Sequence, residues 1–174
     1  MQRIRSLAGR LRERRWFRRL GHALLGRQVR IWVEHEPALD GGGNHGPGRP
    51  TPPQRLLVAT WWGIPVGQAY LLYVSGPLAE DTGWGLYSLS VHRLFRGLGI
   101  GERLVRDHMA WACQRGIPAL RLYASERHAP SMALFRKLGF RRIHIPAIED
   151  RLDREAGPAG RHLILMSKEL EATE

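Results

Sequence analysis

Residues 96–101 read Arg-Gly-Leu-Gly-Ile-Gly, and these residue types at this spacing suit the binding of a phosphate or pyrophosphate group. Glycines at alternate positions allow a sharp turn and bring backbone N–H groups close to a ligand. The apolar residues that follow recur at helical spacing, so these N–H groups lie in a first helical turn, without backbone partners and with partial positive charge. Arg96 adds a full positive charge. The stretch therefore predicts an anion site at a strand-to-helix turn.

Two other phosphate-binding loops do not match. A dinucleotide-binding loop requires a third glycine at position 102, which is Glu102. A nucleoside-triphosphate loop ends in Gly-Lys-Ser/Thr, which this stretch lacks. From the loop alone, a tight turn that binds no ligand remains the alternative.

In its full context, the segment from Val91 to Gly101 closely resembles the pyrophosphate-binding motif of the GNAT superfamily, the acyl-CoA-dependent N-acyltransferases. Residues 131–140, Ser-Met-Ala-Leu-Phe-Arg-Lys-Leu-Gly-Phe, resemble the last helix of that family, usually written Asn-x-x-Ala-x-x-x-Tyr-x-x-x-Gly-Phe. The resemblance covers about residues 28–170. It implies an α/β (mixed α+β) GNAT fold, with a central, mixed, mostly antiparallel sheet that is splayed between strands 4 and 5 and flanked by helices.

The resemblance also implies acetyl-CoA as the acyl donor and a set of residues that bind it. The backbone of Val91 is implied to stabilise the thioester oxyanion, at a bulge where the fourth strand splays from its neighbour. His128 stands where the family usually has an asparagine that contacts CoA. The full set implied to bind the cofactor is Leu89, Val91, Arg96, Gly97, Leu98, Gly99, Ile100, Gly101, His128 and Phe135.

The general acid and the general base remain open. Phe135 occupies the position where many family members have the tyrosine that protonates the leaving thiolate, so this role passes to Tyr123 or Tyr87, or is not needed. Glu126, just after the fifth expected strand, is the first candidate for the base. The acidic residues 80–81 and a chain of water molecules are the alternatives.

Hydrophobic periodicity predicts the elements that position these residues. The helix that starts at Gly101 is expected to stop at Gly116, and Pro130 suits the first turn of a second helix. Residues 76–85 and 147–161 are expected to be loops. The expected strands are 28–35, 55–62, 66–74, 87–91, 119–124, 140–145 and 162–168.

The net charge of +11 is concentrated at the N-terminus, where residues 1–30 carry +9. Residues 1–26 predict a basic amphipathic helical arm, separate from a domain that spans 27–174. An anionic surface (membrane, RNA or the ribosome) is one partner for this arm; a solvated helix packed by one face and a mitochondrial transit peptide are the alternatives. Residues 37–54 are rich in Gly and Pro and predict a loop, where the family usually has two helices beside the acceptor site.

Several classes of protein are disfavoured. The single Cys113 excludes an intramolecular disulfide, and no two of the eight histidines have the spacing of a metal site, so no metal is expected. No apolar run approaches 18 residues, so no integral membrane segment is expected. A cytoplasmic protein follows from these features.

We therefore expect an N-acyltransferase that moves an acetyl or other small acyl group from acyl-CoA to a primary amine by direct attack. The alternative is a CoA-binding or catalytically degenerate GNAT-fold protein that acts through its basic arm on an acidic partner. Phe135 and the missing acceptor-site helices favour the alternative, whereas the intact pyrophosphate motif favours the enzyme.

Overall fold

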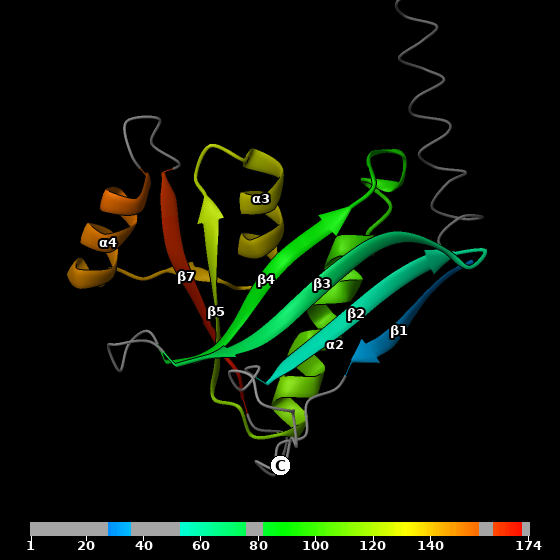
Figure 1. Ribbon diagram of the computed structural model, residues 1–174, viewed down its shortest axis with the longest axis horizontal. Coiled ribbons are helices and arrows are strands. Elements are labelled where there is room, and N and C mark those ends of the chain that lie inside the picture. The colour runs from blue at the N-terminus through cyan, green and yellow to red at the C-terminus, as the bar shows by residue number, and fades with distance from the viewer. Residues whose placement is uncertain (1–27, 36–52, 76–81, 157–161, 172–174) are drawn as a thin grey trace, which may run out of the picture.

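The computed structural model describes residues 28–35, 53–75, 82–156 and 162–171. Its centre is a seven-stranded sheet in the order β1-β2-β3-β4-β5-β7-β6 (Figure 1). Every described pair of strands is antiparallel except β4 and β5, which are parallel. The strands are β1 Val29–His35, β2 Gln54–Trp61, β3 Ile64–Val74, β4 Gly83–Val91, β5 Ala119–Ser125, β6 Arg141–Arg142 and β7 Leu163–Glu169, and the helices are η3 Arg93–Phe95, α2 Ile100–Gln114, α3 Ala129–Lys137 and α4 Pro146–Ala156.

The helices cover both faces of the sheet, as the alternation of β5 shows. Leu122 packs into the main core together with α2 and α3, whereas its neighbour Tyr123 packs into a smaller core with Ile148 and Leu152 of α4. Successive side chains of a strand point to opposite faces. Helices α2 and α3 therefore lie on one face of the sheet, and α4 lies on the other.

The central strands β4 and β5 separate soon after they meet. Their described pairing consists of Gly85 with Arg121 and Leu86 with Leu122, so β4 runs on from Tyr87 to Val91 without a ladder partner in β5. The expected splay between strands 4 and 5 is confirmed, and Figure 1 shows the two strands diverging toward α3.

A bulge in β4 lies near the start of this separation. Gln68 of β3 pairs with Ser90, but Tyr70 pairs with Tyr87, so β4 has one more residue than β3 over this interval. Ser88, within the interval, has a φ of 48°. An extra residue bends a strand and ends its regular pairing. The expectation that the bulge lies at Val91 is wrong, because Val91 itself pairs in register with Gly67.

Helix α2 is held to the sheet by a buried polar network. His108 is fully buried. Its Nδ1 lies 3.1 Å from Nη1 of Arg55 in β2, and its Nε2 lies 3.1 Å from the carbonyl oxygen of Ala69 in β3. An arginine can only donate, so the neutral imidazole accepts at Nδ1 and donates from Nε2. Burial lowers the pKa of His108 to about 4. The network therefore fixes α2 over β2 and β3 with an uncharged histidine.

Three expectations about the elements need correction. Residues 146–156 form α4 rather than a loop, because Ile148 and Leu152, four residues apart, bury one face against Leu165 of β7. The charged residues between them hid this pattern in the sequence. Only Arg141 and Arg142 of the expected strand 140–145 pair with β7, and β4 begins at Gly83, inside the expected loop 76–85.

The expected basic arm, residues 1–26, and almost all of the Gly/Pro-rich loop 37–54 lie outside the described residues. Gln54, the last residue of that loop, is the first residue of β2. The longest of the described helices has 15 residues, and none of them combines the length and hydrophobicity that a membrane span requires.

Candidate functional site

A groove of about 550 Å³ lies where the ends of β4 and α3 meet the start of α2. It brings together most of the residues that the sequence assigns to cofactor binding. Its lining consists of Leu89, Ser90, Val91, Phe95, Arg96, Gly97, Gly99, Ile100, Gly101, Glu102, His128, Pro130, Ser131, Leu134 and Lys137.

The glycines at the start of α2 differ in backbone conformation and in what surrounds them. Gly97 and Gly99 have φ angles of 80° and 76°, which side chains other than that of glycine rarely tolerate. Gly99 is the N-cap of α2, and a Cβ built on it meets no atom within 4 Å. A Cβ on Gly101 instead lies 3.6 Å from Leu134 Cδ2, an ordinary packing contact. The Gly99 backbone therefore faces open groove, whereas Gly101 faces protein.

The first helical hydrogen bond of α2 joins the N–H of Arg103 to the carbonyl oxygen of Gly99. The N–H groups of residues 100–102 precede it and so have no partner within the helix. Since they lie at the positive end of the helix dipole and at the groove, they can bind an anion. The anion site expected from the glycine pattern thus has the geometry that it requires.

The end of β4 presents both backbone and charge to the same groove. The N–H of His92 donates to the carbonyl oxygen of Val66 in β3. Because the backbone groups of successive residues in a strand point to opposite sides, the N–H and C=O of Val91 point away from β3, toward the gap. Arg96 confirms this direction, because its Nε donates to the carbonyl oxygen of Val91 at 2.9 Å. The N–H of Val91 and the guanidinium of Arg96 therefore border one space.

A second cavity of about 290 Å³ continues the groove into the gap between β4 and β5. The two spaces share Leu89, His128 and Ser131. His128 is the N-cap of α3, and its Nδ1 lies 2.7 Å from Ser131 Oγ. A long ligand can therefore run from the start of α2, past His128, into the gap.

Two residues implied to bind the cofactor also belong to the core. The side chain of Phe135 is 6% exposed, and its ring centroid lies 5.9 Å from that of Phe140, while it also lines the cavity in the gap. Phe135 therefore belongs to the main core and also borders the gap. Leu98 packs against the main core and does not line the groove.

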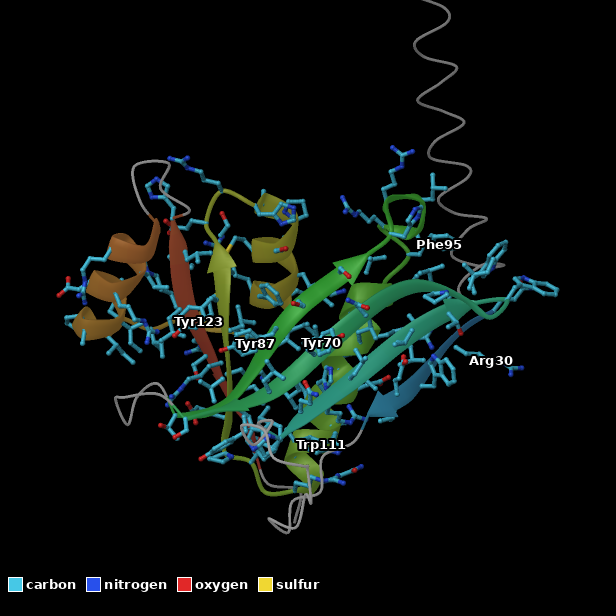
Figure 2. The ribbon with its side chains drawn as sticks, in the orientation of Figure 1. Arg30, Tyr70, Tyr87, Phe95, Trp111 and Tyr123 are labelled. Carbon is cyan, nitrogen blue, oxygen red and sulfur yellow. The ribbon has the colours of Figure 1, made fainter. Side chains whose placement is uncertain are left out.

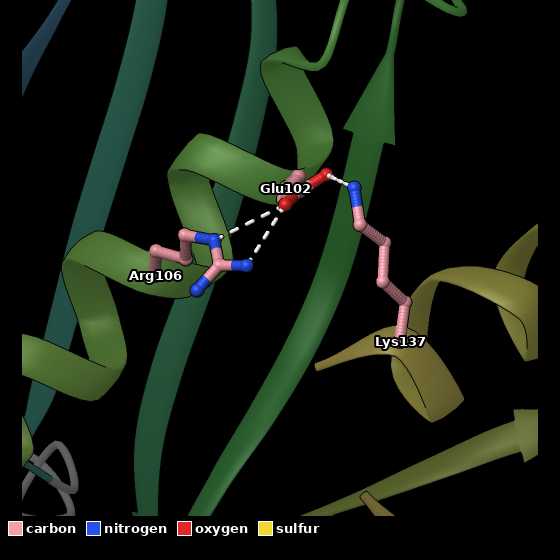
Figure 3. A network of polar contacts seen from close by, with 3 residues as sticks. All are labelled: Glu102, Arg106 and Lys137. Carbon is pink, nitrogen blue, oxygen red and sulfur yellow. Dashed lines mark hydrogen bonds and ion pairs between the residues drawn. The ribbon is translucent and has the colours of Figure 1, made fainter. Parts of the chain in front are cut away.

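One carboxylate at the groove is held by two cations (Figure 3). Glu102 accepts hydrogen bonds from Lys137 Nζ at 2.6 Å and from Arg106 Nη2 at 3.0 Å. The bond from Lys137 is the main reason that the pKa of Glu102 is lowered. Sequence reasoning missed this link between α2 and α3, because only the i, i+4 spacing of Glu102 and Arg106 is visible in the chain.

The residues expected to act in acid–base chemistry lie in different places. Glu126 lines neither the groove nor the gap cavity; its carboxylate forms an ion pair with Arg142 at 2.9 Å, with both side chains well exposed. Tyr123 does line the gap cavity, and its hydroxyl accepts a hydrogen bond from Arg151 of α4 at 3.1 Å. Of these two, the structure brings only Tyr123 to the gap.

The parallel strands β4 and β5 separate, a glycine-rich turn lies at the N-terminus of α2, and the gap between the strands continues the groove. This combination of fold and site is that of the acyl-CoA-dependent acetyltransferases. A family model described as the acetyltransferase (GNAT) family matches residues 29–140. The chain therefore belongs to the GNAT acetyltransferase family.

Solved structures show the same fold. A ribosomal-protein-alanine N-acetyltransferase from Brucella melitensis is 28% identical, with a TM-score of 0.54 over 67% of this chain and 69% of that chain. An IAA acetyltransferase from Bacillus cereus is 23% identical, with a TM-score of 0.54 over 67% and 78% of the two chains. The PaiA N-acetyltransferase from Thermoplasma acidophilum, in complex with coenzyme A, is 18% identical, with a TM-score of 0.50 over 66% and 59%.

Proposed function

We propose that this protein transfers an acetyl or other small acyl group from acyl-CoA to a primary amine by direct attack of the amine on the thioester. The observation that supports this most is the continuity of the anion groove at the start of α2 with the cavity between β4 and β5. A pyrophosphate at the helix N-terminus and a thin apolar chain in the gap would match the two ends of CoA.

The residues at the groove fit the chemical parts of this donor. The N–H groups of residues 100–102 and the guanidinium of Arg96 suit the pyrophosphate. His128 and Ser131, at the junction of the two spaces, offer polar atoms to the amides of the pantetheine. Leu89 and Val91 then lead to the gap, where the thioester would lie.

The reaction needs a neutral amine and a stabilised oxyanion. A lysine-like ammonium has a pKa near ~10.4, so it must lose a proton before its lone pair can attack the carbonyl carbon. As the new C–N bond forms, the carbonyl oxygen gains negative charge, which a fixed backbone N–H can stabilise. The N–H of Val91 faces the gap and can serve in this role. The C–S bond then breaks and the thiolate of CoA leaves, while the nitrogen, which is positively charged after the attack, loses a second proton to water and becomes a neutral amide.

No carboxylate lines the gap cavity among the described residues, and the acidic residues 80–81, which are alternatives for the base, lie outside them. Glu102, the only carboxylate among the described residues that lines the groove, is tied to Lys137 and Arg106. Glu126 is bound to Arg142 away from both cavities. We therefore assign proton removal to water in the gap, and protonation of the thiolate, where it occurs, to the hydroxyl of Tyr123.

The acceptor would reach the thioester from the face that carries α4. Helices α2 and α3 cover the other face, on which the donor lies. Tyr70 and Tyr87 pair across β3 and β4 on this open face, and Tyr123 follows on β5 (Figure 2). We would test a polypeptide N-terminal amine first, because a ribosomal-protein-alanine N-acetyltransferase is 28% identical to this chain in an alignment that covers 69% of that protein.

The donor site is tested by one glycine and its matched neighbour. The side chain in Gly99→Val would project into the groove where no protein atom lies within 4 Å, and it would also strain a backbone with a φ of 76°, so both effects should disrupt the pyrophosphate site and abolish CoA binding while the rest of the domain stays folded. In Gly101→Ala the added methyl group would pack against Leu134, and CoA binding should persist. Calorimetry with CoA measures both, and circular dichroism reports folding. Wild-type affinity in folded Gly99→Val would place the pyrophosphate elsewhere.

The transfer itself is tested by release of the CoA thiol from acetyl-CoA in the presence of a panel of amines that includes alanine-starting peptides. Thiol release that depends on one class of amine supports the enzyme and names its acceptor class. CoA binding without amine-dependent release across the panel would favour the alternative, a catalytically degenerate GNAT-fold protein.

A further inference from the structure

We propose that the turn between β2 and β3, together with η3, forms a docking surface for an anionic lipid bilayer. The surface consists of three exposed apolar side chains, Trp62, Ile64 and Leu94, and two exposed arginines, Arg30 and Arg93. We call it the hairpin surface. It lies outside the groove described above, since none of these five residues lines it.

The apolar side chains of the hairpin surface are unusually open to solvent. Leu94 is 75% exposed, Trp62 is 72% exposed and Ile64 is 59% exposed. Single exposed apolar residues are ordinary, but large ones gathered at one place indicate an interaction site. Trp61 links the segments that carry them: it pairs with Ile64, and its ring centroid lies 6.4 Å from that of Trp62 and 5.6 Å from that of Phe95, the neighbour of Leu94 in η3.

Trp62 also occupies a backbone position that disfavours it. Trp62 and Gly63 form the two-residue turn between Trp61 and Ile64, with φ angles of 52° and 79°. A hairpin turn with two positive φ angles favours Asn-Gly, and a positive φ is rare for a bulky residue. Trp62 packs edge-on against Trp61 and donates a hydrogen bond to Gln28, but most of its ring stays exposed, which indicates a role outside the fold.

The charge around these side chains is of one sign. The chain has no Asp or Glu between residues 54 and 75 or between residues 83 and 101, whereas Arg30 and Arg93 are exposed at this end of the sheet. Figure 2 shows Arg30 and Phe95 at the end of the molecule that carries the β2–β3 turn. Apolar side chains within a cationic, acid-free surface complement an anionic bilayer, where tryptophan prefers the interface.

The basic N-terminal segment joins the domain at the same place. Residues 1–27 contain nine arginines and one glutamate, a charge of +8, and Gln28, the first described residue, accepts a hydrogen bond from Trp62 Nε1 at 2.6 Å. The chain therefore enters the described domain beside the hairpin surface. Arginines attract anionic headgroups, and the apolar side chains add the energy of insertion. Exposed aliphatic side chains such as Ile64 and Leu94 favour a bilayer over RNA, because they offer no ring for stacking on bases.

The test uses the full chain and vesicles of phosphatidylcholine with about one third phosphatidylglycerol, compared with pure phosphatidylcholine vesicles and a poly-uridine RNA. Trp62→Asn and Leu94→Ser are made singly and together. Trp62→Asn gives the turn a favoured Asn-Gly pair, so the variant should melt no lower than the wild type. Val33→Thr, at another exposed apolar position of β1, is the matched control.

We expect the wild type and Val33→Thr to sediment with the anionic vesicles, with a blue shift of tryptophan fluorescence in the wild type. The double variant should lose at least about tenfold in its partition coefficient, because two apolar side chains no longer insert. CoA binding should remain in every variant. The proposal is overturned if the wild type ignores anionic vesicles, if the double variant partitions like the wild type, or if the double variant instead loses RNA binding or a dimer seen by ultracentrifugation.

Discussion

Lowering the pH should detach α2 from the sheet through His108. This side chain is fully buried between α2 and the sheet, and Arg55 is the charged group that faces it. Protonation would remove the acceptor at Nδ1 and place two positive charges side by side in the core. This is why the pKa of His108 falls from 6.5 to about 4, with burial as the largest cause and the charge of Arg55 adding to it.

The magnitude follows from linkage. Between pH 6.5 and 4 the unfolded chain binds a proton at His108 that the folded chain does not, so the free energy of unfolding decreases as the pH falls through this range. A lowering from 6.5 to about 4 corresponds to about 3 kcal/mol at the acid end, at roughly 1.4 kcal/mol per pH unit. Above pH 6.5 this contribution is constant. Since α2 begins with the glycine-rich turn, CoA binding should weaken along with stability.

The assay is urea unfolding, followed by circular dichroism, of the wild type and His108→Gln between pH 4 and 7.5. Glutamine can still accept from Arg55 and donate to Ala69 but does not titrate. The pH dependence of all other groups cancels in the difference between the two proteins. This difference should change by about 3 kcal/mol from pH 7 to pH 4 in the direction that weakens the wild type. A flat difference, or a His108 resonance that titrates near 6.5, would refute the reasoning.

Two further predictions concern the gap and the N-terminal segment. Phe135→Tyr should change turnover by less than about 10²-fold, because a thiolate with a reference pKa near ~8.5 leaves without much help from an acid. Steady-state release of the CoA thiol measures this turnover. A large gain would mean that the wild type lacks an acid it could use. Deleting residues 1–26 should leave CoA affinity, measured by calorimetry, unchanged. It should remove the salt-sensitive part of binding to anionic vesicles, measured by sedimentation at increasing salt. A truncated protein that no longer folds would assign the segment to the packing of the domain.

The local sequence was enough to predict the glycine-rich turn and the helix after it. Both depend on backbone conformation over a few residues, and the structure has positive φ angles at Gly97 and Gly99 and begins α2 at Ile100. The binding of an anion at this turn stays a prediction. Helix α4 escaped prediction because only two apolar residues mark its buried face, and their role depends on a partner strand.

What the sequence determined by itself is the set of residues available for chemistry: a glycine-rich turn beside Arg96, a phenylalanine at position 135, and positive charge gathered in residues 1–30. What only the tertiary structure decided is where that chemistry meets. The pairing of Gln68 with Ser90 but of Tyr70 with Tyr87 places the bulge near Ser88, and the bond from Lys137 to Glu102 joins α3 to α2. Such pairings join residues far apart in the chain, so they are set by the packing of the whole sheet and its helices rather than by any local pattern.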